Sequence, residues 1–279
     1  MSTEDGIAVS ACAADLESYI LPEENPVLLA IDIGNTNIVC GFYDGKRLVT
    51  TLRIATNHAR TSDESAIMLH HFMQLKQVPS ISSMVVATVV PKLESIFRRM
   101  AKDYFQIDPL FVNSNLKLNI TFDYPLPSEI GADRICDAVA AYDKFGGPTI
   151  VVDFGTATTF GVISENGVFI GGVIAPGIET SQTALAQKAA QLFKISFEPP
   201  LSPIGKSSEE AMKAGFYLGA VGQTDYIIES IANYWKKSPK VIATGGLAGL
   251  ISPLSKYISE ILPEITLEGL RLIHEMNRG

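Results

Sequence analysis

The sequence predicts an α/β protein in which one βββαβα unit occurs twice, with a cleft between the two copies. Three short runs typical of β-strands follow one another from Val27, and three more follow from Thr149. Helical patterns come after each set. Asp32 and Asp153 stand at equivalent places, each at the end of an apolar run and two residues before a glycine. The predicted parts are an N-terminal extension (1–26), a first domain (27–147) and a second domain (148–279).

The first copy opens with an antiparallel meander. Its three predicted strands are residues 27–33, 38–45 and 47–54. The Asp-Gly pair within Tyr43–Lys46 favours a hairpin turn, because glycine adopts positive φ without steric cost.

A helix and a strand complete this copy. One of the polar residues 61–63 caps the helix, which runs to Gln77. A spacing of about 3.6 residues predicts its apolar face at Ile67, Met68, His71, Phe72 and Leu75. Residues 83–90 form the following strand, which Pro91 stops.

The second copy repeats this order. Its predicted strands are residues 149–155, 158–164 and 168–177, with a turn at 165–167. Helices are predicted over 179–193 and 209–237. The segment 241–251 then reads as a strand, a glycine turn and an apolar helix.

The composition excludes several classes of protein. A net charge of −8 over 279 residues repels phosphates on average, which argues against binding to nucleic acid or to a membrane surface. The three cysteines form no CxxC pair, so we expect reduced thiols in a cytoplasmic protein rather than disulfides or a zinc site. Residues 1–25 are acidic and contain no Lys or Arg, unlike a signal peptide. Polar residues interrupt every apolar stretch before it reaches membrane-spanning length.

Two glycine turns carry the residues expected of a nucleotide site. Gly34 and Gly155 leave backbone N–H groups open to a phosphate, because no Cβ stands in the way. Neutral donors follow each glycine, at residues 35–37 and 156–159. The aspartate before each glycine would repel a nucleotide but attract Mg²⁺, its waters or a monovalent cation. Together the turns indicate a metal–nucleotide site, whereas either alone fits an ordinary hairpin.

A helix predicted over Ile130–Tyr142 carries the candidate catalytic base. Asp133 and Arg134 lie in its first turns, and Asp137 shares a face with Asp133. Two like charges on one face raise a carboxyl pKa, which suits a general base. The alternative is a solvated helix start with an ordinary Asp/Arg pair.

Eight segments in order along the chain carry a specific resemblance. They read DIGNTN, RTSDE, GADR, VDFGTATTF, GGVIAPG, IGKSS, ATGGLA and LEGL. From Leu28 to Asn277 the chain resembles the type III pantothenate kinases, within the superfamily of acetate and sugar kinases, heat-shock 70 proteins and actin. This resemblance implies duplicated ribonuclease H-like (actin-like ATPase) domains with a central cleft.

The resemblance also implies a reaction and a set of site residues. The reaction is ATP-dependent phosphorylation of pantothenate to 4'-phosphopantothenate, the first step of coenzyme A biosynthesis, in a homodimer that needs Mg²⁺ and a monovalent cation (K⁺ or NH₄⁺). Asp133 would accept the proton, and Asp153 would bind the monovalent ion. The implied ATP contacts are Asp32, Ile33, Gly34, Asn35, Thr36, Asn37, Ile38, Val39 and Thr156. The implied pantothenate contacts are Tyr124, Gly131, Ala132, Asp133, Arg134 and Ser208, and Arg134 would neutralise either the substrate carboxylate or the transferring phosphate.

Three positions depart from the family pattern. Ser208 replaces a threonine that reaches pantothenate in the partner subunit's site, Gly161 replaces a common aspartate near the cation, and Asp137 stands where asparagine is common. Two other readings therefore stay open at this point. One is a kinase or phosphohydrolase for another small alcohol or phosphate, and the other is a non-enzymatic regulatory or binding protein on the same fold.

Overall fold

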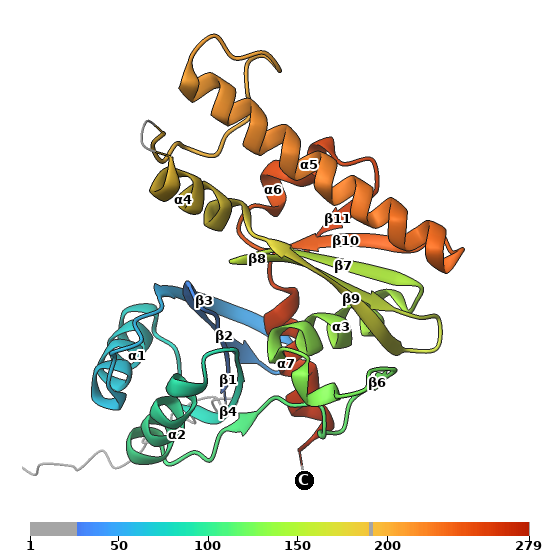
Figure 1. The fold of residues 1–279 in the computed structure, drawn as a ribbon. Helices are drawn as coiled ribbons and strands as arrows, with labels where there is room; N and C mark the ends of the chain where they lie inside the picture. The colour runs from blue at the N-terminus through green and yellow to red at the C-terminus, as the bar shows by residue number, and fades with distance from the viewer. Residues whose placement is uncertain (1–26, 190–191, 279) are drawn as a thin grey trace, which may run out of the picture.

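The computed structural model describes residues 27–189 and 192–278, so the predicted N-terminal extension lies outside the described residues. Two mixed sheets each carry helices on their outer side, and two further helices lie between the sheets (Figure 1). Within the described ranges, no helix combines the length and the apolar character needed to cross a membrane.

The first sheet has the strand order β3-β2-β1-β4-β5. Its strands are Val27–Ile33 (β1), Asn37–Asp44 (β2), Arg47–Ala55 (β3), Ile81–Thr88 (β4) and Leu110–Phe111 (β5). The first three form the predicted antiparallel meander, and β4 and β5 add to it in parallel. Gly45 has a φ of 58° in the hairpin turn, which confirms the turn read from Asp-Gly. Helices α1 (Ser62–Lys76) and α2 (Pro91–Phe105) pack on the outer face of this sheet.

Helix α1 begins within the predicted residues but buries a different face. Thr61 and Glu64 form a capping box, in which each side chain accepts a hydrogen bond from the backbone N–H of the other. The predicted apolar face was right only in part: Phe72 packs against the core cluster, whereas Ile67 and Leu75 are each 69% exposed and His71 is exposed as well. The side chains buried instead include Ser65, Ala66, Leu69 and Met73. Ser65 and Ala66 are small and let α1 lie close to the sheet, and this close packing sets which face of the helix is buried.

The second sheet has the order β11-β10-β7-β8-β9-β6. Its strands are Thr121–Phe122 (β6), Thr149–Phe154 (β7), Ala157–Ile163 (β8), Val168–Pro176 (β9), Lys240–Thr244 (β10) and Ile258–Ile261 (β11). Its outer helices are α4 (Ile178–Lys188), α5 (Ser208–Trp235) and α6 (Ala248–Ile251), and two 3₁₀ turns are η1 (Pro127–Glu129) and η2 (Ser252–Leu254).

The two sheets repeat one arrangement, so the predicted duplication is confirmed. The meander β7-β8-β9 corresponds to β1-β2-β3, and β4 and β10 each pair in parallel with the first strand of their meander. The helix ends differ from expectation. The helix predicted over 179–193 ends at Lys188, and the apolar helix predicted after Gly246 is only the four-residue α6, which a proline in η2 follows.

Helices α3 (Ala132–Phe145) and α7 (Ile265–Met276) lie side by side between the sheets (Figure 1). They fill a core cluster that takes buried residues from both sheets, such as Leu28, Val85, Val151 and Phe169. A Cβ on Gly269 in α7 would overlap the backbone of α3, so glycine sets their close approach. The α3–α7 pair therefore fixes one sheet against the other. The domain division at 147/148 stays a prediction. Two elements cross it in the folded chain, because β6 from the first part joins the second sheet and α7 from the second part packs against the first sheet.

Candidate active site

The two predicted glycine turns meet in the folded chain. Gly34 and Gly155 each donate their N–H to a carbonyl across the turn, at 3.0 and 3.1 Å, so the prediction that these two N–H groups are open to a phosphate was wrong. The hydroxyl oxygens of Thr36 and Thr156 lie 2.8 Å apart in a hydrogen bond that links one turn to the other. The tips of the β1–β2 and β7–β8 hairpins therefore converge on one place, as a shared phosphate site requires.

Neighbouring segments hold both turns in position. Thr56, just after β3, donates its hydroxyl to the Gly34 carbonyl at 2.7 Å. Thr180, in the first turn of α4, donates its hydroxyl to the Thr156 carbonyl at 2.7 Å. A Cβ on Gly177, which precedes α4, would overlap that same carbonyl. Helix α4 therefore starts directly beside the second turn.

Three carboxyl groups from different elements gather beside these turns. Asp32 lies near the end of β1, Asp153 near the end of β7, and Asp133 in the first turn of α3. Burial, followed by the negative charges of Asp133 and Asp153, raises the pKa of Asp32 to about 8. Burial and the charge of Asp133 raise the pKa of Asp153 to about 7. Buried carboxylates whose negative charges act on one another favour a bound cation.

The candidate base Asp133 has its own environment. Burial raises its pKa, while the Arg134 backbone N–H, which donates to Asp133 Oδ1 at 2.7 Å, partly opposes the rise. Asp137 is buried one turn further along α3, and its Oδ1 accepts a hydrogen bond from Thr266 Oγ1 at 2.7 Å. Asp137 therefore ties α3 to α7. The main cause of the raised pKa of Asp133 is burial.

The Arg134 side chain reaches from α3 to the second sheet. Its guanidinium carbon lies 5.4 Å from the centroid of the Phe169 ring in β9. A Cβ on Gly172 would lie 2.8 Å from Nη2, so the glycine leaves the space that the guanidinium occupies. The Nε atom is buried and makes no hydrogen bond within the described residues. A cation placed in this way suits an anionic group of a substrate.

The third glycine turn lies against the second carboxylate. Gly245 follows β10 with a φ of 88°, a conformation that favours glycine. A Cβ at this position would overlap Asp153 Oδ1 and would lie 2.6 Å from the Phe154 carbonyl oxygen. The turn after β10 therefore helps to hold the Asp153 carboxylate in place.

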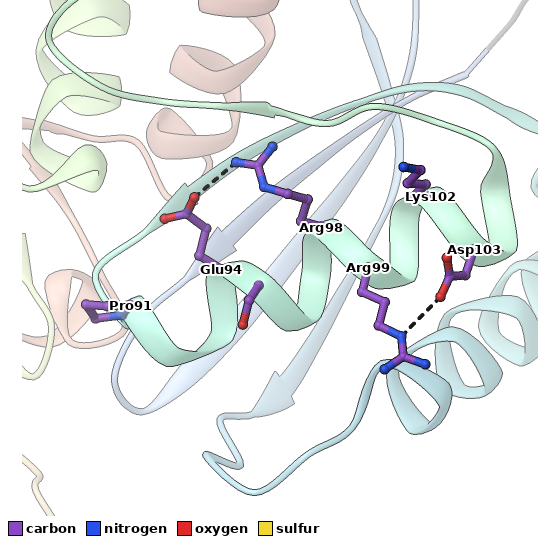
Figure 2. Close-up of a pocket in the computed structure, with 7 residues that line it drawn as sticks. Pro91, Glu94, Arg98, Arg99, Lys102 and Asp103 are labelled. Atoms are coloured by element: carbon purple, nitrogen blue, oxygen red, sulfur yellow. Dashed lines mark hydrogen bonds and ion pairs between the residues drawn. The ribbon is translucent and has the colours of Figure 1, made fainter.

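A hollow of about 400 Å³ lies elsewhere, along the exposed side of α2. Figure 2 shows two ion pairs among its charged side chains. Arg98 Nη2 lies 3.0 Å from Glu94 Oε1, and Arg99 Nε lies 3.1 Å from Asp103 Oδ2. Exposed pairs along one helix are typical of a solvated surface. We therefore place the active site where the glycine turns meet.

Comparison with known proteins decides the family. The family model for type III pantothenate kinases matches residues 28–230. The chain belongs to the type III pantothenate kinase family. Type III pantothenate kinases from Anaeromyxobacter sp. (strain K) and Geobacter sulfurreducens are 45% and 43% identical to it over 254 residues. Each alignment covers 90% of this chain and 100% of the relative.

Solved structures support the fold of this type III pantothenate kinase. A Campylobacter jejuni protein, named as a candidate Baf family transcriptional activator, gives a TM-score of 0.56 at 19% identity over 89% of this chain and 98% of its own. The ethanolamine utilization protein EutJ from Carboxydothermus hydrogenoformans gives a TM-score of 0.54 at 17% identity, over 89% of this chain and 90% of its own. At these identities the likeness concerns the fold alone. With the repeated sheets, it supports the duplicated ribonuclease H-like architecture.

The structure of this type III pantothenate kinase brings most of the predicted residues together. Asp32, the 34–37 turn, Thr156, Asp153 and the start of α3 surround the meeting point of the hairpins. The other predicted ATP contacts include strand residues with core side chains, namely Ile33 and Ile38, which are fully buried, and Val39, which packs against the central cluster.

Two predicted pantothenate contacts come from segments other than the hairpins and α3. Tyr124 follows β6 and packs partly against the central cluster. Ser208 is the first residue of α5. Figure 1 shows the N-terminal end of α5 well apart from α3 in the same chain.

Sequence reasoning missed several residues beside the turns. Thr56 and Thr180 carry no motif signal by themselves, although a threonine just after a Pro-Gly helix start could have drawn attention. Ile174 is 64% exposed and pairs with Thr159, which in turn pairs with Asp153. Side-by-side residues in a sheet share a face, so Ile174 lies on the same face as Asp153. The position of Ile174 beside the site follows only from the pairing of residues across β7, β8 and β9, which the sequence does not give.

The raised pKa of Asp32 predicts how stability depends on pH. The folded state binds the Asp32 proton more tightly than the unfolded state does. The contribution of this proton to folding stability is therefore fully present below pH 3.8, the pKa of the unfolded state, and is lost as the pH rises through about 8, the pKa of the folded state. The ligand-free protein should therefore lose up to about 4 kcal/mol through Asp32 between about pH 5 and about pH 9, and Asp32→Asn should reduce this dependence, to which Asp153 also contributes. Urea unfolding at both pH values measures it. Asp143→Asn, an exposed change on α3, should keep the wild-type slope; equal slopes for all three proteins would contradict the prediction.

Proposed function

We propose that this protein transfers the γ-phosphoryl group of ATP to the primary hydroxyl of pantothenate, giving 4'-phosphopantothenate in the first step of coenzyme A biosynthesis. The observation that carries the proposal is the hydrogen bond between Thr36 and Thr156, which joins the two glycine turns. The carboxyl group of Asp133, the candidate base, acts on the carboxyl group of Asp32 beside these turns. The curated relatives bear the name of this kinase over nearly the whole chain. They favour this reaction over a regulatory protein.

The chain's own residues fit phosphoryl transfer, which depends mostly on positioning and on charge stabilisation. The hydroxyls of Thr36 and Thr156 and the backbone N–H groups of residues 35, 36 and 156 would bind the phosphate oxygens, because the Gly34 and Gly155 N–H groups already donate across their own turns. Asp133 would orient the acceptor hydroxyl and take its proton, and its raised pKa suits that role. Arg134 would bind the pantothenate carboxylate, because its buried Nε lacks a partner in the described structure.

The residues also fit cations. Asp32 and Asp153 are buried carboxyl groups with raised pKa values, and the charge of Asp153 contributes to the rise at Asp32, so a positive charge between them and the phosphates would be favourable. No three His, Cys, Asp or Glu side chains among the described residues cluster as a complete metal site. Phosphate oxygens, backbone groups or waters would therefore supply the other ligands. Mg²⁺ would neutralise the phosphates, and we assign a monovalent cation to Asp153.

A steady-state assay tests the reaction. Purified protein with MgATP should phosphorylate pantothenate and discriminate against a panel of other small alcohols, and added K⁺ or NH₄⁺ should raise the rate. Turnover of a different alcohol, or ATP hydrolysis that needs no acceptor, would replace this function with another on the same fold. If the activity does not depend on monovalent cations, the assignment of such an ion to Asp153 is wrong, and the proposed reaction stands.

We also infer a homodimer with shared sites. Ser208 lies at the start of α5 and away from α3, so a hydroxyl at this position would reach pantothenate only from a second chain. Exposed apolar side chains on and before α5, at Leu201, Ile204, Leu218 and Tyr226, offer surface for such contact. Light scattering should give twice the mass of one chain, and Ser208→Ala should raise the KM for pantothenate. A fully active monomer would contradict the inference. The cytoplasmic location remains a prediction from the cysteine content.

A further inference from the structure

We propose that Phe169 is a positioning residue for the acceptor substrate and holds the Arg134 guanidinium in place. The proposal rests on the proposed function, because it requires that Arg134 contact pantothenate. Phe169 lies in β9 and is fully buried, so it acts through Arg134 without touching the substrate.

The first support is the contact between the two side chains. The Arg134 guanidinium carbon lies 5.4 Å from the ring centroid, within the range of about 6 Å over which a cation is attracted to an aromatic face. Such contacts contribute roughly 0.5–2 kcal/mol, with the larger values at desolvated sites. The buried Nε of Arg134 has no hydrogen-bond partner in the described structure. The ring is therefore a main support of this side chain.

The second support is the space made by two glycines. Gly161 and Gly172 are paired neighbours on β8 and β9. A Cβ on Gly161 would lie 3.3 Å from Phe169 Cε2, and one on Gly172 would lie 2.8 Å from Arg134 Nη2. A Cβ on Gly172 would also overlap the Phe160 carbonyl oxygen, so side chains at these positions would crowd the strand backbone as well as the ring and the guanidinium. The sheet surface is thus shaped to receive both groups.

The third support is the link from Phe169 to the second predicted pantothenate contact. Phe122 in β6 pairs with Phe169, and their rings meet edge to face at 6.3 Å and 61°. The Asp123 N–H donates to the Phe169 carbonyl at 3.0 Å. Tyr124 is the next residue along the chain. One buried residue therefore anchors both the guanidinium and the segment that leads to Tyr124.

This arrangement predicts a selective effect on the acceptor. An arginine without its support samples more rotamers, and binding must then restrict them again. Phe169→Met keeps an apolar side chain but removes the aromatic face. It should raise the KM for pantothenate about 3- to 30-fold, the range that the cation–aromatic contact corresponds to. The KM for MgATP should stay within about twofold, because Phe169 lies in the central core cluster and is not part of the glycine turns.

Phe160→Met is the matched control. Phe160 lies on the neighbouring strand β8, is equally buried, and packs on the opposite face of the same sheet. It should lower the melting temperature in a similar way while leaving both KM values near wild type. If Phe169→Met fails to fold, Phe169→Leu gives the same comparison with a smaller side chain. Equal changes in both KM values, or the same pattern in Phe160→Met, would overturn the proposal.

A double-mutant cycle separates positioning from general damage. In an Arg134→Met background, Phe169→Met should raise the KM for pantothenate no further, because the group through which it acts is gone. An undiminished effect in that background would overturn the proposal. The proposed function is tested by a different result, because it fails only if the unaltered protein does not phosphorylate pantothenate. If it does, and Arg134→Met raises the KM while Phe169→Met leaves it unchanged, only the positioning role is lost.

Discussion

Asp133→Asn is expected to lower kcat for pantothenate phosphorylation by about 10²–10⁴-fold, the usual contribution of a general base. Asparagine has nearly the same shape and can still accept the hydrogen bond from the Arg134 N–H, but it cannot take a proton. The KM for MgATP should change little, because Asp133 lies on α3 and outside the glycine turns. Steady-state kinetics with each substrate varied in turn measures both effects.

Two measurements make this result specific to the base. Asp143→Asn changes an exposed aspartate on the same helix and should keep the wild-type kcat. Thermal unfolding should show that Asp133→Asn is at least as stable as wild type near neutral pH, since it removes a buried carboxyl whose pKa is raised. Full turnover by Asp133→Asn would take the base role away from this residue and leave the fold unaffected.

Gly245→Ala is expected to damage both folding and nucleotide use. The new Cβ would require an unfavourable positive φ and would overlap Asp153 Oδ1 and the Phe154 carbonyl. Strain and overlap together should cost about 2–4 kcal/mol in the free energy of unfolding. Because the change also moves the Asp153 carboxylate, kcat/KM for MgATP should fall by at least about tenfold. Urea unfolding and kinetics at a temperature where the variant is folded measure these effects.

Gly246→Ala is the control one residue away. An added Cβ there meets nothing within 4 Å, and its φ lies outside the positive region. It should change stability by less than about 0.5 kcal/mol and leave MgATP kinetics intact. If both alanine variants behave alike, the close approach of Gly245 to Asp153 is unimportant for catalysis.

Local signals predicted much of the fold. The Asp-Gly turn, the meanders and the strand before Pro91 follow from turn chemistry and β-type runs, which depend only on near neighbours. Rotation of α1 could not be predicted, because Ile67 and Leu75 fit an apolar stripe as well as Leu69 and Met73 do. Packing against the sheet decided between them.

The candidate site was predictable only in part. The residue types after each hairpin strand indicated phosphate binding, and the structure places Thr36 against Thr156. Their contact depends on how α3 and α7 set the two sheets, which no local pattern encodes. The same holds for Phe169 and Arg134, since two strands and a helix must come into register before ring and guanidinium meet.

Helix α7 gives this chain an unusual order of assembly. It supplies Ile265, Leu267 and Leu270 to a cluster that includes Leu28 and Ala30 of the first strand. During synthesis on the ribosome, one apolar face of the first sheet stays exposed to water until α7 emerges. The first sheet therefore cannot complete its packing before α7 is made, and chaperones that shield apolar surface should help the nascent chain until then.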